Sequence, residues 1–545
     1  SFPSLTVMII QLAISVSHSV TTGGTYIMII RLCLTLSVAI LGCEGANILV
    51  FTPTGSHSHQ NTFRPIFREL FRRGHNITYV TSLPDSNAPY HQIVVRDAFM
   101  EMLDSYNLFD GRSVGFIEDL KMNLDVVDLN GLTLTDPKVQ DLITSTDTHF
   151  DLVVLESFIF QEVYAAFGHR FQAPTVELLG LPPQFWFFYV TGNPYSFSYT
   201  TSAMTENTDR MDFMGRITNT FLGMKNIIFT KYFMMPKHEA MARKYFRYPG
   251  WEKRPPLEKL MANISLVLQN TNAASHYPHP YNPNVIEISG TQLQEPSKLP
   301  QDLQTFLDDA KEGVVYFSLG SVVKGSLMPE NVKNVFLSVF GKLPYKVLWK
   351  FETDALQNVP KNVKISKWLP QKDLLGHPNI KLFITHGGLA SMIEAIYHAV
   401  PMVTIPVFFD QVKNALHVNA GGYGVHIDFK NITEESISWA IRTAAQPSYK
   451  ENAKRQSMIL RDNPIKPVDR AVYWIEYVIR YKGAPHLRTP VATMPWYQYH
   501  LIDVASVVLL TVVFALYTVY FILRKILLLL LGISNITLNK QKKLN

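Results

Sequence analysis

The sequence predicts an α/β protein made of two successive strand–helix units, followed by a membrane-spanning helix near the C-terminus. Apolar segments of strand length alternate with helical segments twice along the 545-residue chain, and such alternation implies parallel sheets covered on both faces. A loop rich in proline, asparagine and glutamine, Tyr277–Pro300, separates the two units. The uncharged run Val504–Leu523 would be roughly 30 Å long as a helix, which matches the hydrocarbon thickness of a bilayer.

Composition narrows the functional classes. The net charge of +6 is accompanied by only 17% charged residues, and no run of basic residues is interleaved with aromatic ones. We therefore expect neither a nucleic-acid partner nor a disordered tail. The length is sufficient for two domains with a large core. Whether the protein forms a homo-oligomer cannot be read from the sequence.

The N-terminal residues are typical of a secretory signal over residues 28–45. Met28 is a candidate initiator, the apolar run Leu32–Leu41 follows one positive charge, and small residues come next. Cleavage near Gly45 would remove both cysteines, so we expect no disulfide in the remaining protein. The alternative is a signal anchor that is retained. Residues 1–27 precede the candidate initiator, and their status is unclear.

The first unit is expected over residues 46–285. Strands are expected at Ile48–Thr52, Ile77–Thr81, Leu152–Leu155 and near Ser265–Leu268, with a helix at about 62–73 between the first two. The stretch Pro182–Pro256 is rich in aromatic residues and methionine and has no clear period-2 pattern, so helices are expected there. These helices either line an apolar cavity, touch the bilayer surface or belong to the core.

The second unit is expected over residues 286–446. Its strands are expected at Val314–Leu319, Lys346–Trp349, Leu382–Thr385, Met402–Ile405 and Val425–Ile427. Residues 447–500 form a helical return and a juxtamembrane segment in this interpretation. The transmembrane helix follows at 501–523, and residues 524–545 form a tail.

The most informative segment is Phe383–Gln411. It is interpreted as the end of a buried strand, a His-Gly-Gly turn at residues 386–388, a helix, a second strand after Pro401, and the polar pair Asp410-Gln411. A strand that runs into glycines at a helix start leaves backbone N–H groups free to bind phosphate oxygens. The carboxyl edge of such a sheet is where ligands bind in open α/β folds.

This segment resembles the UDP-glycosyltransferase family of UDP-glucuronosyl- and UDP-glucosyltransferases. The match extends upstream through Trp368-Leu-Pro-Gln371 and Leu375-Gly-His-Pro378 and downstream to Asn414. So long a pattern of fixed spacings is far more specific than a lone glycine motif. The resemblance, which is nearest to invertebrate membrane-bound members, implies a GT-B fold. In this fold two Rossmann-like domains face a cleft.

The resemblance also implies a UDP-sugar site in the second domain. Ser321, His386, Gly388 and Ser391 would bind the diphosphate. Trp368 would stack on uracil, Gln371 would contact the base or ribose, and Glu394 would accept from the ribose hydroxyls. Asp410 and Gln411 would bind the sugar hydroxyls, with Asn414 as a weaker candidate. No D-x-D pair or His/Cys cluster is evident, so transfer without a metal or other cofactor is expected.

A general base is expected after the first strand, because transfer to an alcohol requires a group that accepts the hydroxyl proton. His57 and His59 both follow this strand, and the family spacing to Arg73-Gly-His75 selects His59, with His57 as the runner-up. The carboxylate that orients the base falls on Glu156, where the vertebrate pattern has aspartate. Whether Glu156 fully replaces that aspartate stays open.

The expected reaction is inverting transfer of a hexose to a hydroxyl of a small lipophilic acceptor, for detoxification or for hormone or pigment conjugation. His279 occupies a position where vertebrate members commonly have arginine, so UDP-glucose is favoured over UDP-glucuronate as the donor. The acceptor itself is not identified. Two other classes compete: a catalytically silent UDP-sugar-binding membrane protein, and a sugar-nucleotide epimerase or hydrolase.

The C-terminal segment predicts a single-pass type I protein of the endoplasmic reticulum membrane. Arg524 and Lys525 follow the span, which places the tail in the cytosol and the large domain in the lumen. Lys542-Lys543 resembles a dilysine retrieval signal. Sequons at Asn76, Asn263 and Asn431 would then be lumenal and available for glycosylation, unlike a fourth at Asn535.

Overall fold

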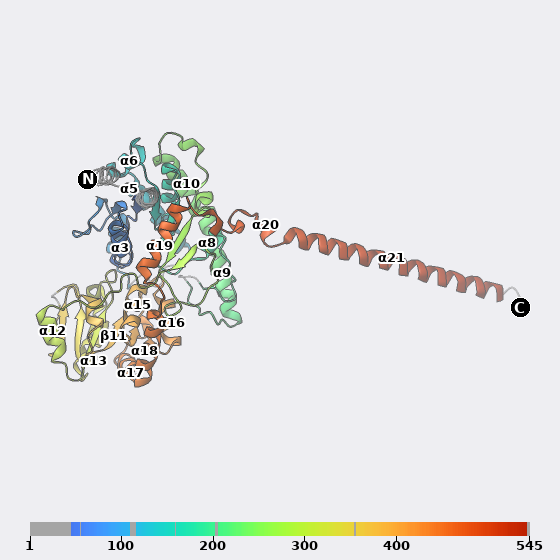
Figure 1. The fold of residues 1–545 in the computed structure, drawn as a ribbon. Coiled ribbons are helices and arrows are strands. Elements are labelled where there is room, and N and C mark those ends of the chain that lie inside the picture. The colour runs from blue at the N-terminus through green and yellow to red at the C-terminus, as the bar shows by residue number, and fades with distance from the viewer. Residues whose placement is uncertain are drawn as a thin grey trace, which may run out of the picture. The chain divides into compact units, whose positions relative to one another are not determined.

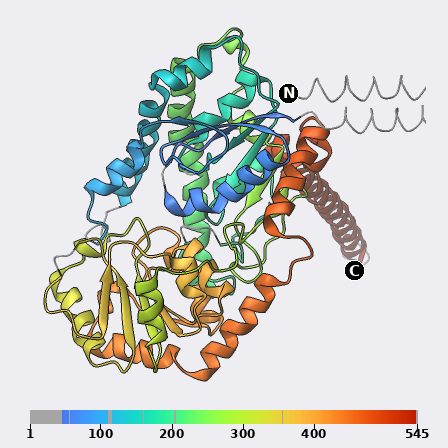
Figure 2. The same ribbon diagram turned by 60° about the vertical axis from the view of Figure 1, so that its left-hand side comes forward.

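The computed structural model describes residues 45–54, 56–109, 116–158, 160–201, 205–353 and 356–541, with side chains omitted at 116–117 and 533–541. The protein divides into two compact units, Ser1–Arg488 and Thr489–Asn545. The predicted signal segment, except Gly45, and the dilysine pair lie outside the described residues. In the first unit, one lobe holds the first sheet and a second lobe holds the second sheet (Figure 2).

The first sheet has seven parallel strands in the order β3-β2-β1-β4-β5-β6-β7. The central strands are buried on both faces because their residues are almost all apolar. The order reverses direction between β1 and β4, so this is the topological switch point. The strands are β1 (Asn47–Phe51), β2 (Asn76–Thr81), β3 (His91–Val94), β4 (Leu152–Leu155), β5 (Thr175–Leu179), β6 (Leu266–Gln269) and β7 (Val285–Glu287).

The second sheet has six parallel strands in the order β10-β9-β8-β11-β12-β13. Its switch point lies between β8 and β11. The strands are β8 (Val314–Ser318), β9 (Lys346–Lys350), β10 (Val363–Ser366), β11 (Ile380–Thr385), β12 (Met402–Thr404) and β13 (Gly424–His426). The doubly wound arrangement predicted from alternating strands and helices is therefore present in both lobes.

Helices cover the sheets in both lobes (Figure 1). In the first lobe they are α3 (His57–Arg72), α4 (Ala98–Ser105), α5 (Phe116–Leu134), α6 (Pro137–Thr144), α7 (Ala166–Phe171), α8 (Phe185–Thr191), α9 (Phe213–Phe229), the π-helical segment η3 (Thr230–Met234), α10 (Met235–Tyr245) and α11 (Leu257–Ala262). In the second lobe they are α12 (Gln301–Asp308), α13 (Glu330–Gly341), α14 (Gln371–Leu375), α15 (Leu389–Tyr397), α16 (Gln411–Ala420) and α17 (Glu434–Ala444). Within Pro182–Pro256 the helical segments α8, α9, η3 and α10 are present as predicted, whereas the described residues between α8 and α9 are not helical.

The helical return consists of α18 (Pro447–Arg461) and α19 (Pro467–Arg480). Helix α18 packs on α15 of the second lobe, whereas α19 crosses back to α3 of the first lobe. Val472, Ile475 and Val478 of α19 are buried in the same core cluster as β1 and β2.

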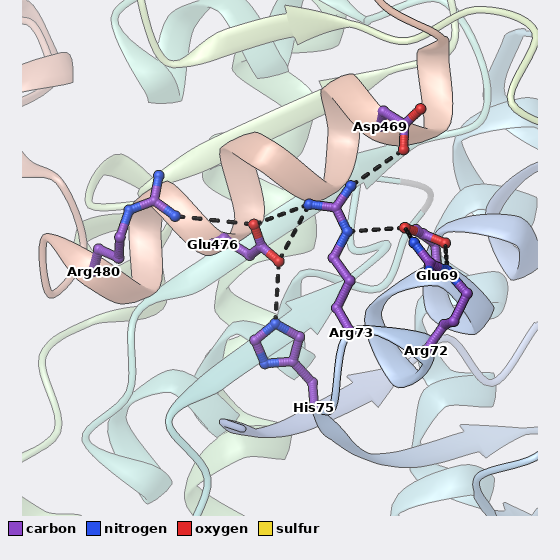
Figure 3. A network of polar contacts seen from close by, with 7 residues as sticks. All are labelled: Glu69, Arg72, Arg73, His75, Asp469, Glu476 and Arg480. Carbon is purple, nitrogen blue, oxygen red and sulfur yellow. Dashed lines mark hydrogen bonds and ion pairs between the residues drawn. The ribbon is translucent and has the colours of Figure 1, made fainter. Parts of the chain in front are cut away.

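A polar network fixes the outer edge of this crossing (Figure 3). Arg73 joins Glu69 of α3 to Asp469 and Glu476 of α19, with contacts of 2.9 to 3.2 Å. The bonds from Arg72 and Arg73 lower the pKa of Glu69 to about 2, so this carboxylate stays charged over the physiological range. The helical return that follows the second sheet thus fastens the two lobes together.

Three sequence-based boundaries are corrected. Strand β7 lies inside Tyr277–Pro300, which was predicted as a linker, and the predicted boundary at 285/286 falls within it. Helix α3 begins at His57 rather than near residue 62, so both candidate histidines lie in its first turn. Strands β3 and β5 were not predicted.

The second unit contains α20 (Trp496–Tyr499) and the 40-residue helix α21 (Ile502–Gln541). Ile502–Gly532 is long and apolar enough to cross a membrane, with a mean hydropathy of 2.4. The apolar helix extends beyond the predicted span at 501–523. The run Ile526–Leu531 resumes the apolar sequence after Arg524 and Lys525, so the helix continues into the segment that was predicted as a tail.

Candidate active site

The carboxyl ends of both sheets line one cavity of about 490 Å³, within the usual range for small-molecule sites. Residues that follow the two switch points contribute to its wall, as expected for open α/β sheets. The structure brings together all the predicted site residues except Asn414. Those lining the cavity are His59, Glu156, Ser321, Trp368, Gln371, His386, Gly388, Ser391, Glu394, Asp410 and Gln411, with His57 beside them.

His59 and Glu156 form a close pair at the first switch point. The Nδ1 atom of His59 lies 2.6 Å from Oε1 of Glu156, and both side chains are largely buried. With the carboxylate ionised, Nδ1–H donates to it and Nε2 is left as the proton acceptor. The extra methylene of Glu156, relative to aspartate, therefore does not prevent contact with the histidine.

Two carboxylates raise the pKa of His59. Burial alone would lower the pKa of His59, but the charge and hydrogen bond of Glu156, together with the charge of Asp410, raise it above its ordinary value. Asp410 belongs to the other lobe. The candidate base of the first domain is therefore electrostatically coupled to the candidate sugar-binding residue of the second.

Gly180, which follows β5, was missed by sequence reasoning. A Cβ atom there would lie 2.5 Å from Nδ1 of His59 and 2.7 Å from Oε1 of Glu156, so any side chain would displace the pair. Its backbone N–H also donates to Oε1 of Glu156 at 3.2 Å. A glycine directly after a buried strand was the available signal, but β5 itself had not been predicted.

His386 is held between two glycines after β11. A Cβ atom at Gly320 or at Gly388 would lie 2.6 Å from the imidazole ring, and Gly320 also has a φ of +80°. Burial, assisted by the charge of Lys350, lowers the pKa of His386 to about 4. The ring is therefore neutral near pH 7 and can serve as a neutral hydrogen-bond donor to a ligand.

The first turn of α15 lies in the cavity wall. Gly388, Leu389, Ala390 and Ser391 all line it, and the first N–H groups of a helix have no acceptor within the helix. Together with the helix dipole, these groups make a binding site for an anion such as a diphosphate.

Gln371 is oriented by three neighbours. Its amide donates to Ser391 Oγ at 3.0 Å and to Glu394 Oε2 at 2.7 Å, and its oxygen accepts from the hydroxyl of Tyr316 at 3.2 Å. Burial raises the pKa of Glu394 to about 7. These side chains satisfy one another without a ligand, so a bound ribose would have to exchange some of these bonds.

Asp410 and Gln411 are fixed at the start of α16. Gln411 Oε1 accepts from the backbone N–H groups of Val407 and Phe408, which leaves its NH₂ group for a ligand. Asn414 donates to Asp410 Oδ2 at 2.6 Å and to the carbonyl of Gly387 at 3.0 Å. Asn414 thus holds the Asp410 carboxylate and the glycine turn in place, and it does not line the cavity itself.

Trp368 and His57 both line the cavity and their rings are in contact. Their ring centroids are 5.4 Å apart, although the residues come from different lobes. Trp368 is 59% exposed, so its indole is available for stacking rather than used in the core. Glu156 pairs with His59, and burial together with the charges of Arg64 and Lys350 lowers the pKa of His57.

Lys350, the last residue of β9, is a cation in the cavity wall that sequence reasoning missed. Its Nζ donates to the carbonyl of Gly320 at 2.8 Å and to Glu352 Oε1 at 2.9 Å. It thereby fixes the turn that presents Ser321, and it places positive charge near His386. A lysine at the end of a strand is usually exposed to solvent, so no signal in the sequence indicated that Lys350 lines a cavity.

The apolar part of the wall comes from α4 and the β12–α16 loop. Phe99, Met100 and Leu103 line it from α4, and Phe408 and Phe409 line it from the loop. In its described residues, the helical stretch Pro182–Pro256 contributes nothing to this wall, so the suggestion that it lines an apolar cavity is not supported. Helix α4 was not predicted.

Glu177 is a buried carboxyl beside the candidate catalytic pair. It accepts hydrogen bonds from the backbone N–H and the hydroxyl of Ser157, the residue after Glu156. Burial raises its pKa from 4.5 to about 8. The folded state therefore holds this proton more tightly than the unfolded state, and the resulting stabilisation is complete below about pH 4.5 and is lost as the pH rises to about 8.

Glu177→Gln is expected to raise the thermal unfolding midpoint in detergent at pH 8 and to change it little at pH 5. The amide keeps the shape of the side chain but cannot ionise. Differential scanning fluorimetry at the two pH values measures the effect. Equal shifts at both pH values would show that Glu177 does not titrate in this way.

Comparison with known proteins decides the family. The family model for UDP-glucuronosyl and UDP-glucosyl transferases matches residues 134–537. This chain belongs to that family. UDP-glucosyltransferase 2 of Dactylopius coccus is 36% identical over 484 residues, covering 87% of this chain and 92% of the relative. Human UDP-glucuronosyltransferase 2B10 is 36% identical over 382 residues, covering 70% of each protein.

Solved glycosyltransferases share the fold. The calicheamicin glycosyltransferase CalG4 superposes with a TM-score of 0.57 at 18% identity, over 80% of this chain and 99% of its own. A UDP-glucosyltransferase of Polygonum tinctorium gives a TM-score of 0.54 at 16% identity, over 80% and 99%. The predicted GT-B fold and enzyme class are confirmed: this UDP-glycosyltransferase family member is a UDP-sugar-dependent glycosyltransferase with a C-terminal helix suited to anchor it in a membrane.

Proposed function

We propose that this enzyme transfers glucose from UDP-glucose to a hydroxyl of a small lipophilic acceptor, with inversion at the anomeric carbon. The observation that carries the proposal is the His59–Glu156 pair at 2.6 Å, in the same cavity as the anion-binding start of α15. One wall therefore offers a base and the other offers a site for a departing diphosphate.

The chemistry is a direct displacement. Nε2 of His59 accepts the proton of the acceptor hydroxyl as its oxygen bonds to the anomeric carbon, and the Glu156 carboxylate stabilises the imidazolium. The bond from that carbon to the UDP oxygen breaks on the opposite face. UDP leaves with its negative charge towards the N–H groups of α15, His386 and Lys350.

The preference for glucose rests on His279 and on relatives. His279 does not line the cavity, and burial together with the charge of Lys413 lowers its pKa to about 3, so it carries no charge for a glucuronate carboxylate near pH 7. The Dactylopius relative is named as a UDP-glucosyltransferase. The apolar side chains of α4 favour a lipophilic acceptor, as in detoxification or in hormone or pigment conjugation.

We also propose residence in the endoplasmic reticulum membrane with the two lobes in the lumen, after removal of a signal peptide. Asn76, Asn263 and Asn431 are all exposed, as glycan acceptors must be. A shift in gel mobility after endoglycosidase treatment, lost when all three asparagines are replaced, tests this orientation.

UDP release with a simple phenol, measured with UDP-glucose and UDP-glucuronate in separate reactions, tests the donor. Release with UDP-glucose alone is expected. Release with glucuronate alone would overturn the sugar assignment. UDP binding without release from either donor, repeated over a panel of phenols and alcohols, would favour the silent binding protein.

Lys350→Met is expected to weaken UDP-sugar use while sparing the acceptor. The substitution removes a charge-assisted bond to the Gly320 turn, and such bonds contribute about 1.5–3 kcal/mol, or roughly 10- to 100-fold. The KM for UDP-glucose should rise by that order with the KM for the phenol unchanged. A change in the acceptor KM alone would place Lys350 outside the donor site.

Transfer is proposed to need no metal or other cofactor. The start of α15, the neutral ring of His386 and Lys350 lie in the wall where the diphosphate is proposed to bind. Turnover should therefore be unchanged after prolonged dialysis against a chelator. Loss of activity that added Mg²⁺ or Mn²⁺ restores would contradict this.

A further inference from the structure

Helix α4 lines the apolar part of the cavity, yet its own lobe holds it only loosely. Of its eight residues, Ala98 alone is fully buried, while Phe99 and Met102 pack partly against the core of the first lobe. A helix of this length is marginal in water unless tertiary contacts fix it. The place of this wall in the cavity therefore depends on what holds the two ends of the helix.

The N-terminal end of α4 is tied to the first lobe. Asp97 accepts from the backbone N–H of Met100 at 3.0 Å and so caps the helix. Its other carboxylate oxygen accepts from the hydroxyl of Ser82 at 2.9 Å. Ser82 comes directly after β2, so this end of the helix is fixed to the first sheet.

The C-terminal end of α4 and the chain beyond it reach the second lobe. Asp104 pairs with Lys324 at 2.9 Å, and the side-chain amide of Asn107 donates to the carbonyl of Leu327 at 3.3 Å. Lys324 comes three residues after Ser321, so these contacts reach the segment that carries part of the proposed diphosphate site. Both members of the ion pair are partly exposed, and such pairs contribute little alone.

Phe109, between α4 and α5, is the stronger anchor. Its ring is 7% exposed and belongs to the core cluster of the second lobe, with Phe317 and Trp349. The ring centroid lies 4.9 Å from that of Phe429 in the 3-10 turn η6 (Phe429–Asn431). Burying a phenylalanine removes a large apolar area from water, and an aromatic pair at this distance adds to the gain. A residue of the first lobe thus completes the core of the second, and neither Phe109 nor Phe429 lines the cavity.

We propose that Phe109 is a positioning residue for the acceptor: its insertion against Phe429 holds α4 in place beside the hydroxyl-bearing substrate. The inference rests on the proposed function, because it needs an acceptor that binds against α4. It adds that the second lobe shapes the acceptor site through residues that do not touch the acceptor. The proposed donor contacts belong to the second lobe itself, so they should not depend on this anchor.

Kinetics and hydrogen–deuterium exchange of the full-length protein in detergent test the proposal. The test variants are Phe109→Ala and Phe429→Ala, which remove the two halves of one contact. The control is Phe340→Ala on α13, a buried phenylalanine of the same core cluster that packs on Phe317 and Trp349. Phe109→Leu, Phe429→Leu and Phe340→Leu form a milder set that replaces any alanine variant that does not fold.

The KM for 1-naphthol, at a saturating concentration of the UDP-sugar that the wild type uses, should rise on the order of 10-fold in both test variants, because small misplacements of a binding group are costly. The KM for the UDP-sugar should change little, and the amide hydrogens of α4 should exchange faster than in the wild type. The double variant should be no worse than either single one, since both remove the same contact. Phe340→Ala should lower the unfolding midpoint without changing the acceptor KM or the exchange of α4. If the wild type does not use 1-naphthol, the phenol or alcohol of the panel that it uses fastest takes its place.

An unchanged acceptor KM in the test variants would overturn the proposal even if α4 exchanged faster, because the anchor would then not serve the acceptor. Unchanged exchange of α4 would contradict the anchoring itself. An effect of Phe109→Ala that Phe429→Ala does not share would show that the second lobe is not the support, and a raised acceptor KM in Phe340→Ala would show a general effect of destabilisation; either result contradicts the proposal. A wild type that transfers sugar to no member of the panel would instead remove the proposed function, and this inference with it.

Discussion

His59→Ala is expected to lower kcat for transfer to a phenol by about 10²- to 10⁴-fold, the usual contribution of a general base. The imidazole lies in the cavity wall and has the carboxylate of Glu156 2.6 Å away. UDP binding should persist, because the proposed contacts to UDP lie in the second lobe. Turnover of the variant in detergent or microsomes, alongside UDP binding by calorimetry, measures both effects.

His57→Ala is the matched control for this substitution. It removes a histidine from the same helical turn, but one that faces Trp368 rather than Glu156. A moderate change in donor KM is expected, with kcat largely retained. If His57→Ala abolished turnover and His59→Ala did not, the assignment of the base would be reversed.

Glu156→Gln is expected to lower kcat/KM on the order of 10²-fold at neutral pH, since a charge close to His59 is worth several kcal/mol at moderate effective dielectric. It should also change the pH profile. His59 acts as a base only when it is neutral, and Glu156 raises its pKa, so activity of the wild type rises with pH through that raised value. Removing the charge should move this acidic limb to lower pH.

Glu156→Asp separates geometry from charge. The shorter side chain keeps the carboxylate but withdraws it from Nδ1, so a smaller loss than with glutamine is expected, and the acidic limb should stay nearer its wild-type position. An acidic limb that Glu156→Gln leaves in place would show that Glu156 does not set the pKa of the base.

The donor site could be predicted from the sequence because its residues come from short, locally defined segments. The strand, glycine turn and helix around His386 carry Gly388, Ser391 and Glu394 at fixed spacings, and all three residues line the cavity. The two lobes could be predicted as well, since buried parallel strands are continuous apolar runs. The structure assigns Asn414 a different task, holding Asp410, because a helical spacing does not tell which side of the helix meets a ligand.

The features that the sequence did not reveal depend on contacts between residues that are far apart in the chain. Gly180 matters because the His59–Glu156 pair closes over it, and Lys350 matters because its ammonium reaches the Gly320 carbonyl. Strands β3 and β7 were missed because both are short edge strands, of four and three residues, and β3 is also partly exposed. The start of α3 was placed too late because the polar run His57–Asn61 shows no apolar helical pattern and Pro65 lies inside the helix.

The configuration of the product tests the central claim most directly, namely that His59 delivers an acceptor hydroxyl in a single displacement of UDP. The wild-type enzyme would be given α-linked UDP-glucose and a simple phenol, and the anomeric proton of the glycoside examined by NMR. The account predicts a β-glucoside. An α-glucoside would require retention of configuration and would contradict the single displacement, and free glucose as the sole sugar product would contradict transfer itself.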